Sequence, residues 1–89
     1  MTRFVIPADV ACANVEDGAV VLHMGTKRYF SLNETGAAIW RLIEEGVAIE
    51  EIPAQLSASY DVTVDEARRE VDALVHALEA KTLITVDGA

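Results

Sequence analysis

The chain is short and acidic, and both properties narrow the range of functions. It has 89 residues, and 15 Asp and Glu against 7 Lys and Arg give it a formal net charge of −8. A chain of this length forms one domain with a modest core, which leaves little room for a catalytic cavity. The acidic balance repels phosphate backbones and anionic lipid surfaces, so we expect neither nucleic acid nor a membrane as a partner.

The cysteine count and the apolar segments bear on the compartment. Cys12 is the single cysteine, so the chain cannot form an internal disulfide. No apolar run approaches the roughly 20 residues of a membrane span, and the N-terminus lacks a charged and then apolar export signal. We therefore expect a cytoplasmic protein.

Strand signals fill the N-terminal part of the chain. Turn residues at Glu16-Asp17-Gly18 and Gly25-Thr26 separate three apolar segments. The segments are Ala11 to Val15, Ala19 to Met24 and Arg28 to Leu32. They predict a three-stranded antiparallel meander. Phe4 to Ile6 is a further extended piece, which Pro7 ends because proline has no backbone donor.

The junction between the third strand and the first helix carries a clear local signal. Asn33 can accept a hydrogen bond from a backbone N–H of the first helical turn, so the helix should begin near Glu34. Gly46 can take the positive φ at which such a helix ends. The residues between them at helical spacing form one apolar stripe: Gly36, Ile39, Trp40 and Ile43. We expect Trp40 to lie in the core.

Two more helices and a short strand are predicted after Gly46. The second helix starts near Glu50, and Pro53 must lie within its first turn. The third helix begins with a capping box of Thr63 and Glu66 and ends near Lys81. Its apolar stripe consists of Val64, Ala67, Val71, Leu74, Val75 and Leu78. Leu83 to Val86 then returns as a strand, like the wing of a winged helix-turn-helix.

These elements together predict an α+β fold of the winged helix-turn-helix-like type. An N-terminal three-stranded antiparallel sheet is followed by three helices and a short C-terminal strand. We expect one domain over residues 1–89, with the sheet within 4–32, the helical part over 33–81 and the strand at 83–86.

The third predicted strand lies at an edge of the sheet, and its sequence leaves that edge open. The unpaired N–H and C=O groups of an edge strand form a template for another strand, and proteins usually block them. Lys27 and Arg28 are the only residues here that could block such pairing, because the segment from Tyr29 to Leu32 contains neither proline nor a charged residue. An extended peptide could add there as a fourth strand, with its main chain bonded to Tyr29 and Ser31.

Both faces of the predicted sheet are apolar. Phe30 and Leu32 share one face by the two-residue period of a strand, and Tyr29 and Ser31 share the other. The run from Val20 to Leu22 likewise places apolar side chains on both faces. We therefore expect the third helix to cover the second face and to leave a groove between itself and the edge strand.

The order and spacing of several short motifs resemble a known family. The run Leu32-Asn33-x-x-Gly36-x-x-Ile39-Trp40, followed by Glu50-Glu51-Ile52, Tyr60-Asp61-Val62 and Leu83-Ile84, is similar to the PqqD-like family over about residues 10 to 86. Members bind the leader part of a ribosomally made precursor peptide and hand it to modifying enzymes. The run from Gly25 to Asn33 is most similar to the separate leader-binding protein of split lasso-peptide proteases. The family usually has Gly where this chain has Thr82, which leaves the turn after the third helix open.

The resemblance implies a site and partners. Family members hold the leader between the third strand and the third helix, and lasso leaders carry a Tyr with a Pro three residues later. The implied peptide-binding residues are Lys27, Arg28, Tyr29, Phe30, Ser31 and Leu32 on the strand, and Arg68, Val71, Asp72, Val75 and Leu78 on the helix. The implied partners are a precursor peptide and a separate cysteine peptidase or other modifying enzyme. The chain itself would be a non-catalytic adaptor.

Simpler explanations exist for most of these residues. Arg68 and Asp72 are four apart and could pair on a solvated helix face, while Val71 and Val75 could be interior. His23, His76 and Cys12 show no metal-ligand spacing, and there is no phosphate-binding Gly-rich loop, so we predict no metal, no cofactor and no catalytic residue.

Two alternative functions and one alternative partner remain at the level of sequence. One function is a carrier of the precursor of pyrroloquinoline quinone, or of another peptide modified by a radical enzyme. Another is a winged-helix DNA-binding protein, although the third helix holds more acids than bases. A second copy of the chain could also occupy the open edge, which would give a homodimer.

Overall fold

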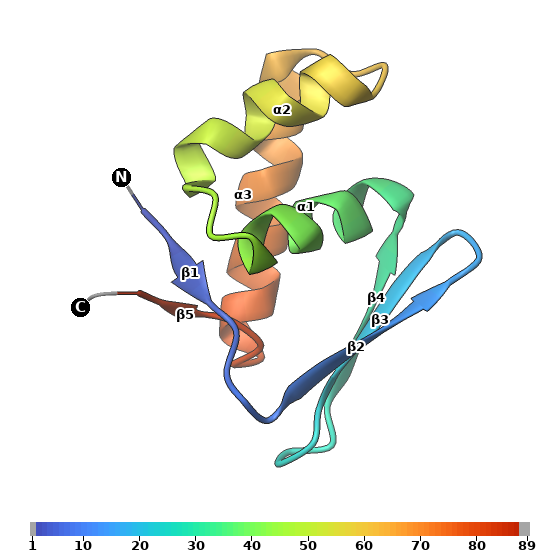
Figure 1. Ribbon diagram of the computed structural model, residues 1–89, viewed down its shortest axis with the longest axis vertical. Helices are drawn as coiled ribbons and strands as arrows, with labels where there is room; N and C mark the ends of the chain where they lie inside the picture. Colours follow the sequence, from blue (N-terminus) through green and yellow to red (C-terminus); the bar gives the residue numbers. More distant parts are fainter. Residues whose placement is uncertain (1, 88–89) are drawn as a thin grey trace.

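The computed structural model describes residues 2–87, so both ends of the expected domain 1–89 lie outside the described part. It consists of a three-stranded sheet, three helices and a separate two-stranded ribbon (Figure 1). The predicted α+β class is confirmed, with antiparallel strands first, then the helices and a C-terminal strand.

The main sheet has the order β2-β3-β4 and is antiparallel throughout. Its strands are β2 (Val10–Val15), β3 (Gly18–His23) and β4 (Tyr29–Asn33). The register places Leu22 between Ala11 of β2 and Tyr29 of β4, so these three side chains share a face. The predicted meander is confirmed, and β4 lies at an edge of the sheet.

A buried histidine organises the loop that leads into β4. His23 is 9% exposed, and its Nδ1 atom accepts hydrogen bonds from the backbone N–H groups of Gly25 (3.1 Å) and Thr26 (3.2 Å). Lys27 follows with a φ of 66°, and its N–H donates to the His23 carbonyl over 2.8 Å. This loop fixes where the edge strand begins.

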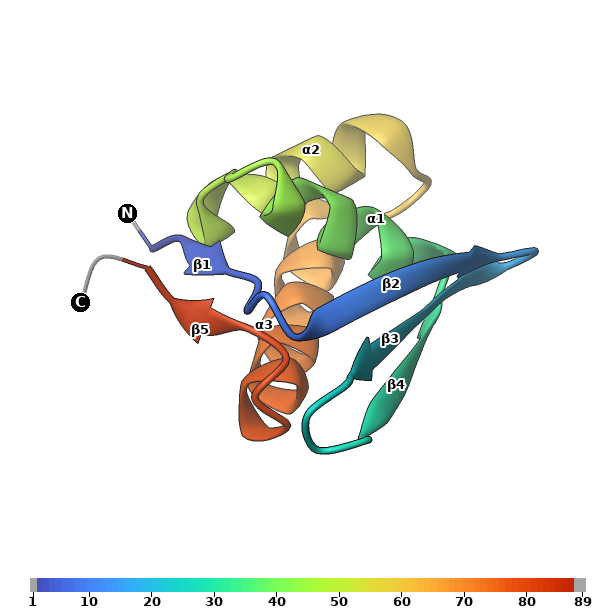
Figure 2. The same cartoon turned by 60° about the horizontal axis from the view of Figure 1, so that its bottom comes forward.

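Helix α1 (Glu34–Glu44) follows β4 directly and packs on the inner face of the sheet (Figure 2). The Asn33 side chain accepts a hydrogen bond from the Gly36 N–H over 2.8 Å, which confirms the predicted cap. A Cβ at position 36 would lie 3.2 Å from the Asn33 Oδ1 atom, so the tight strand-to-helix junction favours glycine. Trp40 is buried in the core as expected.

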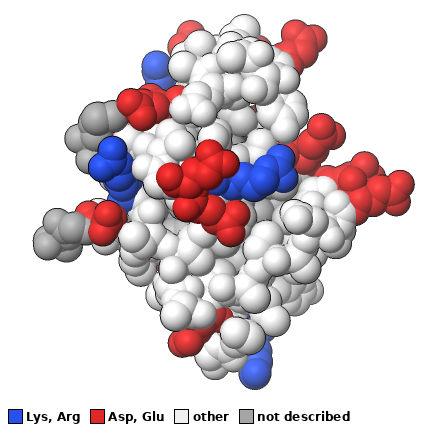
Figure 3. Space-filling view, in the orientation of Figure 1, with Lys and Arg blue, Asp and Glu red and all other residues white. Residues whose placement is uncertain are grey.

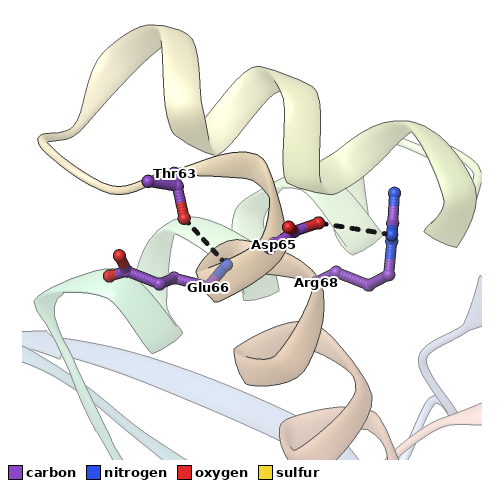
Figure 4. A network of polar contacts seen from close by, with 4 residues as sticks. All are labelled: Thr63, Asp65, Glu66 and Arg68. Carbon is purple, nitrogen blue, oxygen red and sulfur yellow. Dashed lines mark hydrogen bonds and ion pairs between the residues drawn. The ribbon is translucent and has the colours of Figure 1, made fainter.

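Helices α2 (Ile52–Ser59) and α3 (Val64–Ala80) pack against each other. A 3₁₀ turn, η1 (Ile49–Glu51), precedes α2, and Pro53 lies in the first turn of α2 as predicted. The Thr63 hydroxyl caps α3 by accepting a hydrogen bond from the Glu66 N–H over 3.1 Å (Figure 4).

The two ends of the described chain meet in a ribbon outside the main sheet. β1 (Phe4–Val5) pairs antiparallel with β5 (Thr85–Val86), with Phe4 opposite Val86 (Figure 1). The expectation that the N-terminal piece belongs to one sheet within 4–32 was therefore wrong. The C-terminal strand is also shorter than predicted, because Leu83 and Ile84 are buried core residues rather than ladder residues.

Candidate functional site

The outer edge of β4 is open in the structure. The His23 N–H donates to the Arg28 carbonyl over 2.8 Å, which makes these two residues a hydrogen-bonded pair of the ladder. Because such pairs alternate along antiparallel strands, Phe30 also bonds toward β3, whereas Tyr29 and Ser31 direct their backbone groups away from it. No strand among residues 2–87 pairs with this outer side. The edge can therefore accept a further strand.

A groove of about 380 Å³ runs beside this edge. It is bounded by β4, the start of α1 and one side of α3. Its lining consists of Phe30, Ser31, Leu32, Asn33, Gly36, Ile39, Glu70, Ala73, Leu74 and Ala77. The small side chains of Gly36, Ala73 and Ala77 leave space there, and the larger apolar ones give it a predominantly apolar surface. Such a shape suits the side chains of an extended peptide.

Helix α3 faces the groove with residues other than those the sequence indicated. Val71, Val75 and Leu78 are buried in the core. The lining residues Glu70, Ala73, Leu74 and Ala77 follow a spacing of three, one and three, so they form one stripe next to the core stripe. The groove stripe and the core stripe lie about 100° apart around the helix axis, which is the rotation from one residue to the next.

Arg68 and Asp72 lie on the opposite side of α3 from the groove. Both are exposed, and neither lines the groove. Arg68 lies 3.6 Å from Asp65 in an ion pair whose side chains are 62% and 80% exposed (Figure 4). Such a surface pair contributes little to stability. The structure does not bring these two residues to the edge strand.

The six predicted strand residues divide into three groups. Phe30, Ser31 and Leu32 line the groove. Tyr29 is 66% exposed, and its side chain lies on the face of the sheet away from the core. Lys27 and Arg28 are exposed and precede β4, so they lie beyond one end of the groove.

Several lining residues were missed by sequence reasoning. Asn33, Gly36 and Ile39 were interpreted only as a cap and a core stripe, yet they also form part of the groove wall. On α3 the usable signal was Ala73 with Ala77, two small residues four apart beside a stripe of large ones. Small residues next to a core stripe leave a depression at the helix surface.

The outer face of the main sheet is exposed, contrary to the expectation that α3 covers it. Leu22 is 37% exposed and Tyr29 66%, and both lie on this face. Its other members are Ala11, Ala13, Val15, Val20 and Ser31, none of which is charged. Figure 3 shows few charged side chains over the sheet on the side that it displays. The expectation failed because α1 packs on the inner face, where Val21 and Leu32 are buried, and α3 packs against α2 and α1 rather than across the outer face of the sheet.

Three further features of the described residues concern metal binding, membrane spans and the thiol of Cys12. Within residues 2–87 no cluster of His, Cys, Asp and Glu could hold a metal ion. None of the helices in that range is long and apolar enough to cross a membrane. Partial desolvation, and then the nearby Glu44 carboxylate, raises the pKa of the exposed Cys12 thiol, which disfavours the thiolate that a nucleophile needs.

Comparison with known proteins agrees with this geometry. The family model for coenzyme PQQ synthesis protein D (PqqD) matches residues 18–84, which is more than half of the chain. The chain belongs to the PqqD family. A search of curated proteins found no match for this member of the family.

Two solved structures resemble this PqqD-family protein over nearly its whole length. The first, TbiB1 in complex with the TbiA(beta) leader peptide, is 36% identical with a TM-score of 0.80, covering 94% of this chain and 95% of that one. The second, lasso peptide synthetase B1 complexed with the leader peptide, is 25% identical with a TM-score of 0.82, covering 93% and 98%. Both of these similar proteins were solved with a leader peptide bound.

Proposed function

We propose that this protein is a non-catalytic adaptor that binds the leader of a ribosomally synthesised precursor peptide. The leader adds as a strand to the open edge of β4, and some of its side chains enter the groove between β4 and α3. The adaptor, acting as one domain over residues 1–89, then delivers the precursor to a separate processing enzyme. We place this step in the cytoplasm, where ribosomal precursors are made.

The single observation that carries the proposal is the open edge beside an apolar groove. The outward backbone groups of Tyr29 and Ser31 supply affinity that does not depend on the ligand sequence. The groove makes binding selective, because it accepts only side chains that fit against Phe30, Leu74 and the small alanines of α3. The two similar proteins that carry leader peptides support this assignment.

The processing enzyme in this proposal is a leader peptidase of a lasso-peptide pathway. Binding performs no chemistry itself. It raises the local concentration of the cleavage junction at the enzyme and so makes the encounter nearly intramolecular. The exposed and uncharged outer face of the sheet, centred on Leu22, gives the enzyme an apolar surface to dock on.

The alternative functions are less well supported. The segment from Val64 to Lys81 holds five acids against three bases, which disfavours a helix that approaches phosphates. A carrier for the pyrroloquinoline quinone precursor would use the same fold, but both similar structures described above are leader-peptide complexes, and one of the two proteins is a lasso peptide synthetase B1.

Proline substitution at the edge tests strand addition directly. Tyr29→Pro removes a backbone donor that points away from β3, and Cys12→Pro does the same at the opposite edge of the sheet, on β2. A labelled leader peptide is titrated against both variants and the wild type, after circular dichroism has established that all three fold.

We expect Tyr29→Pro to weaken binding at least about 10-fold, because it removes one hydrogen bond and blocks the approach of a strand. Cys12→Pro should bind within about 2-fold of the wild type, since it leaves the β4 edge intact. Equal affinities of Tyr29→Pro and the wild type would contradict strand addition.

A further inference from the structure

Glu70 is the single charged residue among those that line the groove. Its neighbours in the lining are apolar, apart from Ser31 and Asn33. In the described range the ion pair of α3 joins Arg68 to Asp65, and no ion pair there involves Glu70. Glu70 is exposed and contributes nothing to the core. Its carboxylate is therefore available to a ligand in the groove.

The two ends of the edge strand differ in charge. Helix α3 and strand β4 run in opposite directions (Figure 2), so Glu70, the first α3 residue of the lining, lies toward the Asn33 end. Lys27 and Arg28 lie at the other end, just before β4. Arg28 precedes β4 but accepts a backbone hydrogen bond from His23, which continues the register of β3 and β4, so Arg28 shares the inner face with Phe30 and Leu32. A ligand strand that runs along β4 thus meets a carboxylate in the groove, near Asn33, and a guanidinium just beyond the other end of the groove.

We propose that Glu70 is a specificity-determining residue that selects a leader with a Lys or Arg at the Asn33 end of the groove. Arg28 selects an Asp or Glu on the same face of the leader, about four residues away from that base. This inference rests on the proposed function, since it names the class of peptide that the same groove accepts.

Charged residues are needed at this site because backbone hydrogen bonds alone do not distinguish one ligand sequence or register from another. Main-chain hydrogen bonds to an edge strand are nearly the same for any sequence and any register. A slip by one residue turns every ligand side chain to the other face, and the bonds alone do not prevent it. Two opposite charges at the ends of the groove favour one register and one direction, because the reversed peptide meets like charges.

A coupling experiment tests this proposal. In a leader that binds the wild type, each Lys and Arg is replaced in turn by Gln, and dissociation constants are measured with the wild type and with Glu70→Gln. One replacement should weaken binding to the wild type by about 2- to 5-fold at low salt, because the pair is partly exposed. The same replacement should have almost no effect on binding to Glu70→Gln. The loss of affinity in the wild type, and with it the difference between the wild type and Glu70→Gln, should shrink at high salt.

The control is Glu79→Gln, which changes the net charge equally. Glu79 is an exposed acid of α3, about half a turn away from Glu70 around the helix. In Glu79→Gln, replacement of the coupled base of the leader should weaken binding as much as it does in the wild type. A second pair reverses the charges: Glu70→Lys should recover affinity for a leader in which the coupled base is changed to Glu.

Two results would overturn the inference and leave leader binding intact. One is that no base of the leader couples to Glu70, and the other is that Glu70→Gln binds the unchanged leader as tightly as the wild type. If the wild type binds no leader at all, the proposed function itself fails, and that outcome is recognised before any variant is tested.

Discussion

Gly46 and Thr82 occupy the same position in two copies of one helix-ending motif. After α1, the Gly46 N–H donates to the Ile43 carbonyl and the Val47 N–H to the Leu42 carbonyl, both over 3.0 Å. After α3, the Thr82 N–H donates to Glu79 over 3.0 Å and the Leu83 N–H to Leu78 over 2.9 Å. Both residues have positive φ, 82° for Gly46 and 59° for Thr82. A β-branched residue is strained in this region, whereas glycine is not.

Thr82→Gly should therefore stabilise the protein. Relief of the strained backbone contributes about 1 to 2 kcal/mol, and the greater freedom of glycine in the unfolded chain offsets part of it, so we expect a net gain of about 1 kcal/mol. Gly46→Ala should cost about 1 kcal/mol for the mirrored reason, since a Cβ there meets no atom within 4 Å and only the φ matters. Urea unfolding followed by circular dichroism measures both. A loss of stability in Thr82→Gly would show that the threonine side chain makes a compensating contact.

Filling the groove should weaken leader binding without unfolding the protein. Ala73 and Ala77 line the groove, so Ala73→Leu with Ala77→Leu places bulk where ligand side chains would lie. We expect the dissociation constant to rise at least about 10-fold and the melting temperature to stay nearly unchanged, because neither alanine is fully buried. Ala58→Leu, at an exposed alanine of α2 outside the groove, is the matched control. Equal affinities for all three proteins would mean that the leader does not enter this groove.

The outer face of the sheet can be tested apart from the groove. Leu22→Lys places a charge at the centre of the uncharged face, between Ala11 and Tyr29. Leader affinity should remain within about 2-fold, whereas cleavage of the precursor by the leader peptidase should fall about 10-fold, because a buried charge disrupts an apolar interface. Val5→Lys, at an exposed valine of the β1–β5 ribbon, serves as the control. Undiminished cleavage with Leu22→Lys would place the docking surface elsewhere.

The thiol of Cys12 should react slowly. Partial desolvation of this exposed side chain raises its pKa most, the Glu44 carboxylate raises the pKa further, and the Arg41 guanidinium lowers it. Because only the thiolate is nucleophilic, alkylation by iodoacetamide should reach its half-maximal rate at a higher pH in the folded protein than in the urea-unfolded chain. Glu44→Gln should lower that midpoint and Arg41→Gln should raise it, as followed by mass spectrometry. The assignment of causes is wrong if both variants shift the midpoint in the same direction.

Much of the fold could be predicted because its signals are local. The Asn33 cap, the Thr63 cap, the position of Pro53 and the two-residue alternation of Phe30 and Leu32 depend on neighbours within a few residues along the chain. The same holds for the open edge, because a strand free of proline and charge is visible in the sequence. These features yielded the strand half of the candidate site.

The sequence by itself determined that α3 has one wide apolar side and that β4 leaves an unguarded edge. Only the tertiary structure decided that Val71 and Val75 face the core while Ala73 and Ala77 face the groove. The spacing of residues reports their relative positions around a helix, but the rotation of that helix against α1 and the sheet depends on packing between distant segments. The pairing of β1 with β5 and the exposure of the outer sheet face were decided in the same way, since both depend on which distant segments come to lie side by side.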